Sequence, residues 1–397
     1  MTRPPERPLR VLSLSTLYPH DSAPNFGVFV ERQMQAVAAR GDVDLTMVSP
    51  LGLPPFPLSL HPRYRALRDL PDQEQRGQVR VLRPRFTLLP AIGARFNAGA
   101  IGRAVLPLAR RLHAHQPFDL IDAQFFHPDG LAAVRIAAAL GLPSSIKARG
   151  ADIHHWGRHR ATSAQVREAG QRATGLLAVA QGLADDMAAL GLPREKIGIH
   201  RTGLDADLFR PYDRRLCRDR LGLPRDAAVL ATVGALIPRK GQRFAIAALA
   251  ELPGAILLLA GKGEDEAALR REAGRLGVAE RVRFLGAVPH GELPVVLNAA
   301  DVFVLPTASE GLANAWVEAL ACGTPVITTP IPGAQELITD PAWGRLVPRD
   351  GPAIAAALRE VLSARPAPEV LQAAVAGMSW QANAAALVQH WRRLVAG

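Results

Sequence analysis

Two glutamates eight residues apart, Glu310 and Glu318, combine residue type and spacing in a way that suggests chemistry. Glu318 falls among Val317, Ala319 and Ala321, neighbours too small and apolar for an ordinary solvated helix face. A carboxylate in such surroundings needs a partner, because an unpaired buried charge is costly. The vicinal hydroxyls of a ribose can be that partner, because they donate hydrogen bonds to a carboxylate. The pair therefore predicts a site that holds a ligand rich in hydroxyl groups.

A predicted strand and the helix after it position these glutamates. The apolar run 302–305 is typical of a buried strand, and Glu310 follows its carboxyl end, where ligands of open α/β sheets bind. Helical spacing of apolar residues predicts a helix with one apolar face, formed by Leu312, Ala315, Trp316, Ala319 and Leu320. Gly323 is expected to cap this helix in a left-handed conformation. Alternatively, the two glutamates are a charge favoured by the helix dipole and a surface salt bridge.

Length and composition favour a two-domain α/β protein of the cytoplasm. A chain of 397 residues exceeds the size of a single growing core. Cys217 and Cys322 lie far apart and suggest no disulfide framework, which fits a reducing compartment. Residues 1–19 are interpreted as the first strand, not as a signal peptide. The longest apolar stretch, 245–260, contains Glu251 and Pro253, so no integral membrane span is expected.

The formal net charge is +11, and 43 of the 47 basic residues are arginines. Such a chain is attracted to phosphorylated acceptors, acidic lipid headgroups or nucleic acid. The stretch 80–115 carries arginines between apolar residues and suggests docking on an anionic membrane, or else a solvated arginine face: Arg83, Arg85, Arg95, Arg103, Arg110 and Arg111. Aromatic residues make up only 5% of the chain, which disfavours nucleic acid as a partner.

Short β-rich runs alternate with alanine-rich helical patterns, which is typical of parallel sheets covered by helices. The predicted strands are 9–15, 43–49, 79–83, 118–122, 145–148, 176–180, 197–200, 229–233, 255–259, 282–285, 302–305 and 326–328.

The Glu310–Glu318 pair, followed by the run Ala-Cys-Gly-Thr-Pro-Val at 321–326, resembles the E-x7-E signature of retaining glycosyltransferases of family 4. The stretch 202–211 is similar to the linker of that family. The resemblance implies the GT-B fold, with two Rossmann-like domains facing each other across a cleft. It predicts an acceptor-binding domain at 1–201, a nucleotide-sugar domain at 202–378, and a last helix, 379–397, that returns to the first domain.

By this resemblance, Glu310 holds the hydroxyls of the donor sugar and Glu318 holds the ribose. Gly311, Leu312 and Asn314 are expected beside the same donor.

A strand that ends at Gly234 leads into Arg239, Lys240 and Gly241. Two cations at a helix N-terminus suit a diphosphate, because free amides add to their charge. This segment resembles the glycine-rich loop of the family, with Lys240 on the diphosphate. The family often has arginine where this chain has Ala235, so either Arg239 supplies that charge or the contact is absent. An ordinary solvated pair of cations is the alternative.

A second glycine loop, Gly261-Lys262-Gly263, also follows a strand. A dinucleotide fingerprint is disfavoured because Glu266 occupies its last glycine position. By resemblance, Gly261 flanks the donor and Lys262 contacts phosphate, although a tight turn explains the glycines equally well. The stretch 283–288 resembles the segment whose backbone accepts the nucleobase. Gly333 lies in a turn where glycine would permit a positive φ.

Three segments of the first half complete the predicted site. Gly27 opens a helix and, by resemblance, lets the backbone approach donor and acceptor. His127 follows a strand and resembles the histidine that contacts the donor sugar, although a loop histidine is the simpler interpretation. Arg149 and Asp152 resemble a loop that contacts the acceptor.

The resulting hypothesis is a cytoplasmic enzyme, either free or peripheral on the inner face of a membrane, that moves a hexose from a UDP- or GDP-sugar to a polysaccharide or lipid-linked acceptor. Retention of configuration is implied by the resemblance alone. Arg239 and Lys240 would stabilise the leaving diphosphate, so no metal or cofactor is expected. Two alternatives stay open: a nucleotide-sugar epimerase or phosphorylase on the same fold, and a non-catalytic arginine-rich module that binds anionic glycans.

Overall fold

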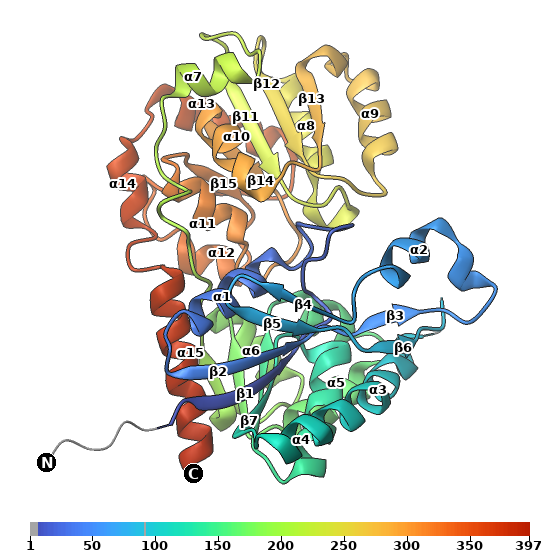
Figure 1. The fold of residues 1–397 in the computed structure, drawn as a ribbon. Helices are drawn as coiled ribbons and strands as arrows, with labels where there is room; N and C mark the ends of the chain where they lie inside the picture. The colour runs from blue at the N-terminus through green and yellow to red at the C-terminus, as the bar shows by residue number, and fades with distance from the viewer. Residues whose placement is uncertain (1–6, 91–92) are drawn as a thin grey trace, which may run out of the picture. The chain divides into compact units, whose positions relative to one another are not determined.

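The computed structural model describes residues 7–90 and 93–397. The chain divides into two compact units, the first formed by Met1–Gly203 with Trp380–Gly397 and the second by Leu204–Ser379. Each unit contains a largely parallel sheet with helices packed on it (Figure 1), which confirms the predicted α/β class. The division between the units falls two residues after the predicted boundary at 201.

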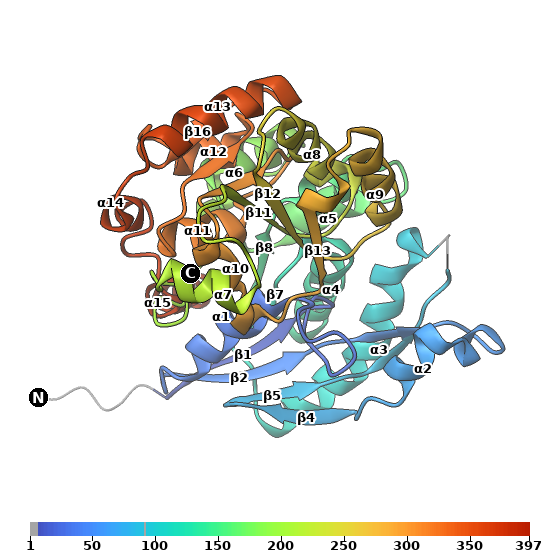
Figure 2. The ribbon, with the colours of Figure 1, turned by 90° about the horizontal axis from the view of Figure 1, so that it is seen from above.

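The first unit contains an eight-stranded sheet in the order β10-β9-β8-β7-β1-β2-β5-β4. The strands pair in parallel except for the edge strand β4, which is antiparallel to β5. Figure 2 shows β1, β2, β5 and β4 side by side. The strands are β1 (Leu9–Leu14), β2 (Val43–Val48), β4 (Gln73–Arg76), β5 (Val79–Leu82), β7 (Leu120–Ala123), β8 (Ser144–Ala148), β9 (Gly175–Ala178) and β10 (Ile197–Ile199), with a separate parallel pair, β3 (Leu51–Leu53) and β6 (Arg85–Thr87).

The helices of this unit are α1 (Val28–Ala38), α2 (Pro62–Arg68), α3 (Ala94–His115), α4 (Leu131–Leu140), α5 (Ser163–Arg172), α6 (Gln181–Ala189) and α15 (Trp380–Ala396). The C-terminal helix α15 packs beside α1, and Trp391 joins Met34 and Val11 in one buried core. Helices α3, α4 and α5 form a second packed group (Figure 1).

The second unit is built on a parallel sheet in the order β13-β12-β11-β14-β15-β16. Its strands are β11 (Val229–Val233), β12 (Ile256–Ala260), β13 (Val282–Gly286), β14 (Val302–Leu305), β15 (Val326–Thr328) and β16 (Gly344–Leu346). Its helices are α7 (Arg214–Arg220), α8 (Gln242–Ala250), α9 (Glu266–Arg275), α10 (Leu293–Ala299), α11 (Asn314–Ala321), α12 (Pro332–Leu337), α13 (Gly351–Ser363) and α14 (Pro368–Ala373). Helices α8 and α13 bury the central strands in one apolar core.

Every predicted strand is present, and its bounds agree within two residues. The short strands β3, β4, β6 and β16 were not predicted. The prediction of one basic amphipathic stretch over 80–115 is wrong. Residues 79–82 and 85–87 form strands, Arg83 is fully buried, and the helix begins only at Ala94.

In both sheets the order of successive strands reverses next to the first strand. In the first unit β1 lies between β2 and β7, and in the second β11 lies between β12 and β14. Ligands of open α/β sheets bind outside the carboxyl ends of the strands at such a switch point. The loops after β1 and β7, and those after β11 and β14, are therefore the places to look for a site.

Candidate active site

The loops that follow β11 and β14 meet around one carboxylate oxygen in the second unit. Lys240 Nζ lies 2.6 Å and Arg239 Nη1 lies 2.7 Å from Glu310 Oε1. Thr307 Oγ1 donates a hydrogen bond of 3.1 Å to the same oxygen. The structure therefore brings together three of the residues predicted from sequence, at the switch point of the second sheet.

Burial and charge act in opposite directions on Glu310. Burial raises the pKa of this carboxyl, but the nearby charges of Lys240 and Arg239 more than offset it and hold the pKa below its usual value. Glu310 is therefore ionised at neutral pH. Two cations around one anion leave a net positive charge among these loops, which suits an anionic ligand such as a diphosphate.

Backbone hydrogen bonds tie the basic loop to the loop of Glu310. The Ala308 amide donates to Arg239 O at 2.8 Å. Arg349 donates through Nε to Pro306 O and through Nη2 to Arg239 O, each at 2.8 Å. The cations are therefore held against Glu310 by main-chain contacts as well as by charge.

Two glycine turns pack against each other, and one of them lies beside Lys240. Gly261 has φ +156°, and a Cβ there would lie 1.9 Å from Gly234 O, so only glycine fits. Gly234 has φ +147°, and a Cβ on it would contact Lys240 Cε at 3.6 Å. The backbone of the Gly234 turn thus comes close to the lysine side chain, and the Gly261 turn packs directly against Gly234.

Glu318 has a protein partner that the sequence did not reveal. His290 Nε2 lies 2.9 Å from Glu318 Oε1, and only 16% and 12% of these side chains are exposed. The His290 ring packs edge-on against Phe209, with centroids 5.0 Å apart. Glu318 is therefore oriented by a histidine that is itself fixed by an aromatic ring.

Three of the remaining residues expected near the donor lie at the start of α11, and Lys262 lies on the loop after β12. Gly311 and Leu312 are buried just before the helix, Asn314 is its first residue, and Lys262 is exposed. The left-handed cap at Gly323 is confirmed, with φ +74°. Gly333 does not use the positive φ that glycine permits: it is helical, and a side chain is excluded because a Cβ would lie 1.8 Å from Gly311 O.

In the first unit, the loop after β7 carries His127. Only 2% of this residue is exposed, and its ring lies 5.1 Å from that of Trp156. Burial lowers the pKa of His127 to about 4, so the imidazole is neutral at physiological pH. Within the described residues its Nδ1 has no hydrogen-bond partner. The unpartnered nitrogen is itself buried, so it is not presented at the surface of the first unit.

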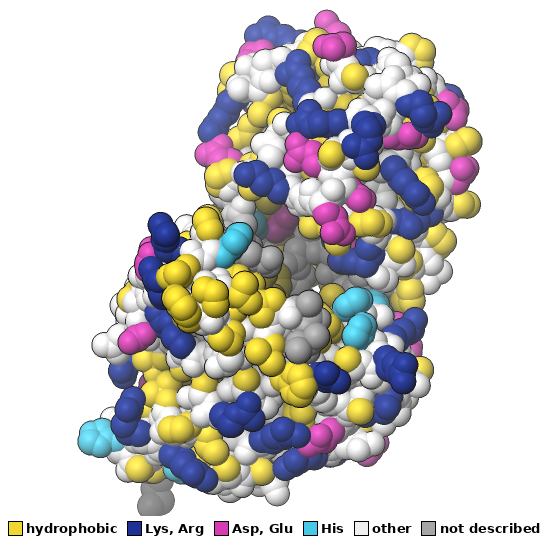
Figure 3. All heavy atoms as spheres, turned by 90° about the vertical axis from the view of Figure 1, so that its right-hand side faces the viewer, with side chains coloured by type: hydrophobic (Ala, Val, Ile, Leu, Met, Phe, Trp, Pro, Cys, Tyr) yellow, Lys and Arg dark blue, Asp and Glu magenta, His cyan; other side chains and the backbone are white. Residues whose placement is uncertain are grey.

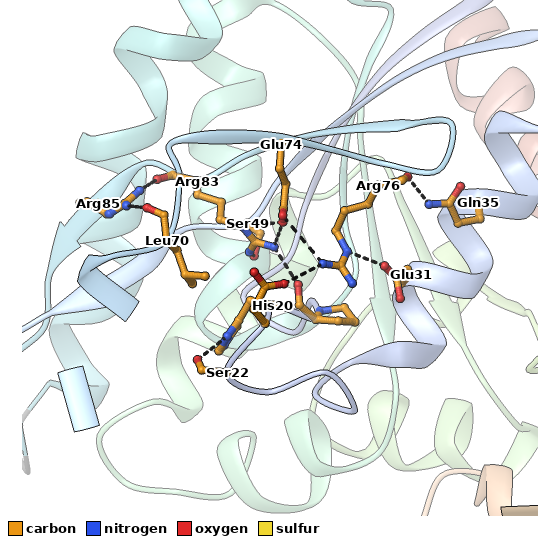
Figure 4. Close-up of polar contacts among 12 residues, drawn as sticks. His20, Ser22, Glu31, Gln35, Ser49, Leu70, Glu74, Arg76, Arg83 and Arg85 are labelled. Carbon is orange, nitrogen blue, oxygen red and sulfur yellow. Dashed lines mark hydrogen bonds and ion pairs between the residues drawn. The ribbon is translucent and has the colours of Figure 1, made fainter. Parts of the chain in front are cut away.

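The neighbouring loop, after β1, carries Gly27. This glycine has φ +74°, and a Cβ would lie 2.5 Å from the carbonyl carbon of Leu17. Figure 4 shows how the loop is anchored: Arg83 donates to Pro19 O at 2.7 Å and forms an ion pair with Glu74. The side chain of Arg83 is fully buried, so the edge strand β4 helps to fix the loop of Gly27.

Arg149 and Asp152 lie on the loop after β8 but differ in exposure. Asp152 is fully buried, and its carboxylate accepts hydrogen bonds from the amides of Arg149, Gly150 and Phe126. Burial also raises the pKa of this carboxyl. Asp152 therefore shapes the loop and exposes no surface to an acceptor. Arg149 is partly exposed and stacks on Phe29 with its guanidinium carbon 4.7 Å from the ring centroid.

Two family models together match most of the chain. Residues 27–208 match the model described as Glycosyltransferase Family 4, and residues 213–376 match Glycosyl transferases group 1. The chain belongs to glycosyltransferase family 4. This confirms the resemblance seen in the sequence and places the chain in a family of transferase enzymes.

Curated relatives of the family 4 chain match over part of their length. D-inositol 3-phosphate glycosyltransferases of Mycobacterium bovis and Mycobacterium tuberculosis are 36% identical over 219 residues. The match covers 52% of this chain and 45% of each relative. The chain thus spans about half the length of the curated relatives it matches.

Solved structures identify the fold as GT-B. Sucrose-phosphate synthase from Thermosynechococcus elongatus superimposes with a TM-score of 0.80, at 23% identity over 98% of this chain and 99% of that one. HepE from Anabaena, solved with UDP-glucose, gives 0.69 at 20% identity over 98% of each chain. At these identities the similarity establishes the fold.

Two buried acids of the first unit were missed by sequence reasoning. Asp122, at the end of β7, accepts hydrogen bonds from Ser13 Oγ at 2.7 Å and Trp391 Nε1 at 3.1 Å. Asp129 accepts from the amide of Thr16 at 2.9 Å, and burial raises its pKa to about 7. Their positions after a strand were the only sequence signal.

Over residues 7–90 and 93–397, no helix is both long enough and apolar enough to cross a bilayer. Within the same ranges, no group of three or more His, Cys, Asp or Glu side chains is arranged to hold a metal ion.

Proposed function

We propose that this family 4 chain transfers a hexose from a nucleoside diphosphate sugar, with UDP or GDP as the nucleotide, to a polysaccharide or lipid-linked glycan acceptor. The observation that carries the proposal is the cluster of Lys240, Arg239 and Glu310 at the switch point of the second sheet. A diphosphate matches the net positive charge there, and the sugar attached to it would reach the Glu310 carboxylate.

The roles of the three side chains follow from the charge that develops during transfer. As the glycosidic bond breaks, negative charge accumulates on the leaving diphosphate, and preorganised cations stabilise it. Lys240 has three N–H groups, so it can contact phosphate while keeping one bond to Glu310. The ionised carboxylate accepts hydrogen bonds from sugar hydroxyls. Because two cations already supply this charge, we propose transfer without a metal or other cofactor.

The rest of the donor is assigned from the same unit. Glu318, oriented by His290, would accept hydrogen bonds from the ribose hydroxyls. The turns at Gly234 and Gly261 would let the diphosphate approach main-chain amides. A UDP-linked donor is supported by the solved structures of HepE, which are described as complexes with UDP and with UDP-glucose.

The acceptor, and retention of anomeric configuration, are proposed from family membership. The first unit offers Gly27, His127 and Arg149 at the carboxyl edge of its sheet, where the sugar and the acceptor would be contacted. The curated relatives are named as D-inositol 3-phosphate glycosyltransferases, which supports an acceptor that carries phosphate.

The test begins with donor binding. We expect one or a few members of a nucleotide-sugar panel to raise the melting temperature of the purified protein. That donor is then incubated with candidate glycan acceptors in EDTA, and NMR follows the anomeric configuration of the product. Retained configuration with EDTA present supports the proposal. Sugar that is isomerised or phosphorolysed without an acceptor supports the epimerase or phosphorylase instead. No stabilisation by any donor contradicts both.

A further inference from the structure

The positive charge of the chain is concentrated in one segment of the first unit. Residues 45–118 contain eleven arginines and only three acidic residues, a formal charge of +8 out of +11 for the whole chain. The other residues are therefore close to neutral. A charge gathered in this way produces a local field rather than a general attraction to anions.

The acidic residues of this segment are paired with arginines of the same segment. Each forms an ion pair with an arginine of the same segment: Asp69 with Arg68, Asp72 with Arg85, and Glu74 with Arg83. Within the described parts of the chain, six exposed arginines of the segment have no carboxylate partner: Arg65, Arg80, Arg95, Arg103, Arg110 and Arg111. Their charge is available to an external anion.

Large apolar side chains are exposed in the same segment. Phe56 is 79% exposed, Leu58 is 55% exposed and Leu60 is 47% exposed. All three lie on the segment that connects β3 to α2. Figure 3 views the side of the molecule that carries α2 and α3, and hydrophobic side chains gather there on the first unit with basic side chains beside them. Phe56, Leu58 and Leu60 together form an exposed apolar patch, the apolar tip, which is unfavourable to leave in water.

Helix α3 places arginines on the same side of the unit as this tip. Ile101, Val105 and Ala109 are buried against the unit, whereas Arg103 and Arg110 are exposed. The helix packs against β6, which pairs with β3, the strand from which the segment with the apolar tip begins. Figures 1 and 2 both place α2 and α3 on one side of the first unit.

A groove of about 450 Å³ lies between β5 and α3. Its lining includes Arg80 and Arg111, which have no acidic partner among the residues that the structure describes, and the apolar side chains of Leu108 and Leu112. Asp72 also lines it but is paired with Arg85 at 2.8 Å. The groove therefore combines guanidinium groups with an aliphatic wall, which matches a phosphate headgroup and the first carbons of its lipid.

We propose that the first unit docks on an anionic lipid bilayer through this surface, the docking surface, formed by Phe56, Leu58 and Leu60 with the exposed arginines named above. Apolar side chains enter the boundary of headgroups and acyl chains while arginines contact the lipid phosphates. An acidic soluble polymer would satisfy the arginines but would leave the apolar tip in water, so a bilayer accounts for both features. The proposal is independent of the donor site and of the reaction.

The test is co-sedimentation of the full chain with vesicles. We expect binding to vesicles of phosphatidylcholine mixed with phosphatidylglycerol, weakening as salt is added, and little binding to phosphatidylcholine alone. The double variant Phe56→Ser, Leu58→Ser and the triple variant Arg103→Gln, Arg110→Gln, Arg111→Gln should each bind the anionic vesicles at least tenfold more weakly. The expected loss for the triple variant follows because each arginine near an anionic surface raises the affinity for the membrane about fivefold.

The matched control is the double variant Leu216→Ser, Arg271→Gln, which changes an exposed leucine and an exposed arginine of the second unit. It should bind like the wild type. Melting temperatures establish that all variants fold. Equal binding by the wild type and both docking-surface variants would overturn the proposal. So would a wild type that stays in solution with anionic vesicles, or one whose binding to a soluble polyanion is lost in the arginine variant while its vesicle binding persists.

Discussion

Lys240 Nζ lies 2.6 Å from Glu310 Oε1, and only 14% and 13% of the two side chains are exposed. A close and mostly buried ion pair is costly to break from one side, because the remaining charge loses its partner. Here the carboxylate keeps Arg239 as a second cation, so the site tolerates movement of Lys240 toward a ligand.

Replacing Lys240 by alanine should therefore weaken catalysis more than folding. We expect turnover with the identified donor to fall by about a hundredfold or more, since removal of one preorganised donor from a developing anion costs this much. Steady-state kinetics provide the measurement, with the exposed Arg271→Ala as the control. Wild-type turnover in Lys240→Ala would contradict the assignment of the diphosphate to this loop.

Glu310→Gln should separate binding of the nucleotide from transfer of the sugar. The substitution keeps the shape of the side chain but removes the charge that Lys240 and Arg239 now neutralise. Free UDP or GDP should bind at least as tightly as to the wild type, whereas turnover of the nucleotide sugar should fall by about a hundredfold. Calorimetry and kinetics test the two halves. A parallel loss of nucleotide affinity would place Glu310 in a purely structural role.

Glu318 should determine recognition of the ribose. The wild type is expected to bind the nucleotide about tenfold or more tightly than its 2′,3′-dideoxy analogue, because hydrogen bonds to a charged group are worth this much. Glu318→Ala should bind both with similar affinity. His290→Ala should show an intermediate preference, since its contact of 2.9 Å orients the carboxylate. Unchanged discrimination in Glu318→Ala would remove this residue from the site.

The sequence was sufficient for the buried strands and for the residues of the main motifs. Parallel strands covered on both faces form continuous apolar runs, so β11, β12 and β14 could be recognised locally. Strand β4 could not, because Gln73–Arg76 is wholly polar. Its conformation depends on pairing with β5 and on the ion pairs of Glu74 and Arg76, which only the tertiary fold creates.

The side chains that contact the site residues also could not be predicted from the local sequence. His290 begins a short 3-10 helix and Glu318 lies in α11, 28 residues apart, and no periodicity links them. At Gly333 the sequence suggested only that a positive φ is permitted, but what excludes a side chain is the approach of Gly311 O. Identities at motif positions were thus predictable, whereas the contacts that select those identities were not.

Asp129 should make stability depend on pH in an unusual direction. Its folded pKa of about 7 exceeds the usual value of 3.8, so the folded state binds more protons between these values and stability falls as pH rises through them. Relative to Asp129→Asn, the wild type should lose up to about 4 kcal/mol over this range, with no further change above it. Urea unfolding at several pH values measures the difference. A constant difference would contradict the shifted pKa.

His390 should act in the opposite sense over the same range. Burial lowers its pKa from 6.5 to about 4, so the unfolded state binds more protons and stability is lost as pH falls from about 6.5 to 4. Relative to His390→Asn, the wild type should lose up to about 3 kcal/mol. The exposed His115→Asn is the control. Equal slopes in all three proteins would show that His390 titrates normally.

Trp391 should reveal how strongly the C-terminal helix stabilises the first unit. The side chain is fully buried in the core shared with α1, and its indole N–H donates to Asp122 at 3.1 Å. Trp391→Ala should cost about 3–5 kcal/mol of unfolding free energy, because a large cavity forms. Trp391→Phe keeps most of the volume but leaves the buried carboxyl with one donor fewer, so about 1–3 kcal/mol is expected. Chemical denaturation of both variants gives the comparison. An alanine variant as stable as the wild type would mean that α15 contributes nothing to this unit.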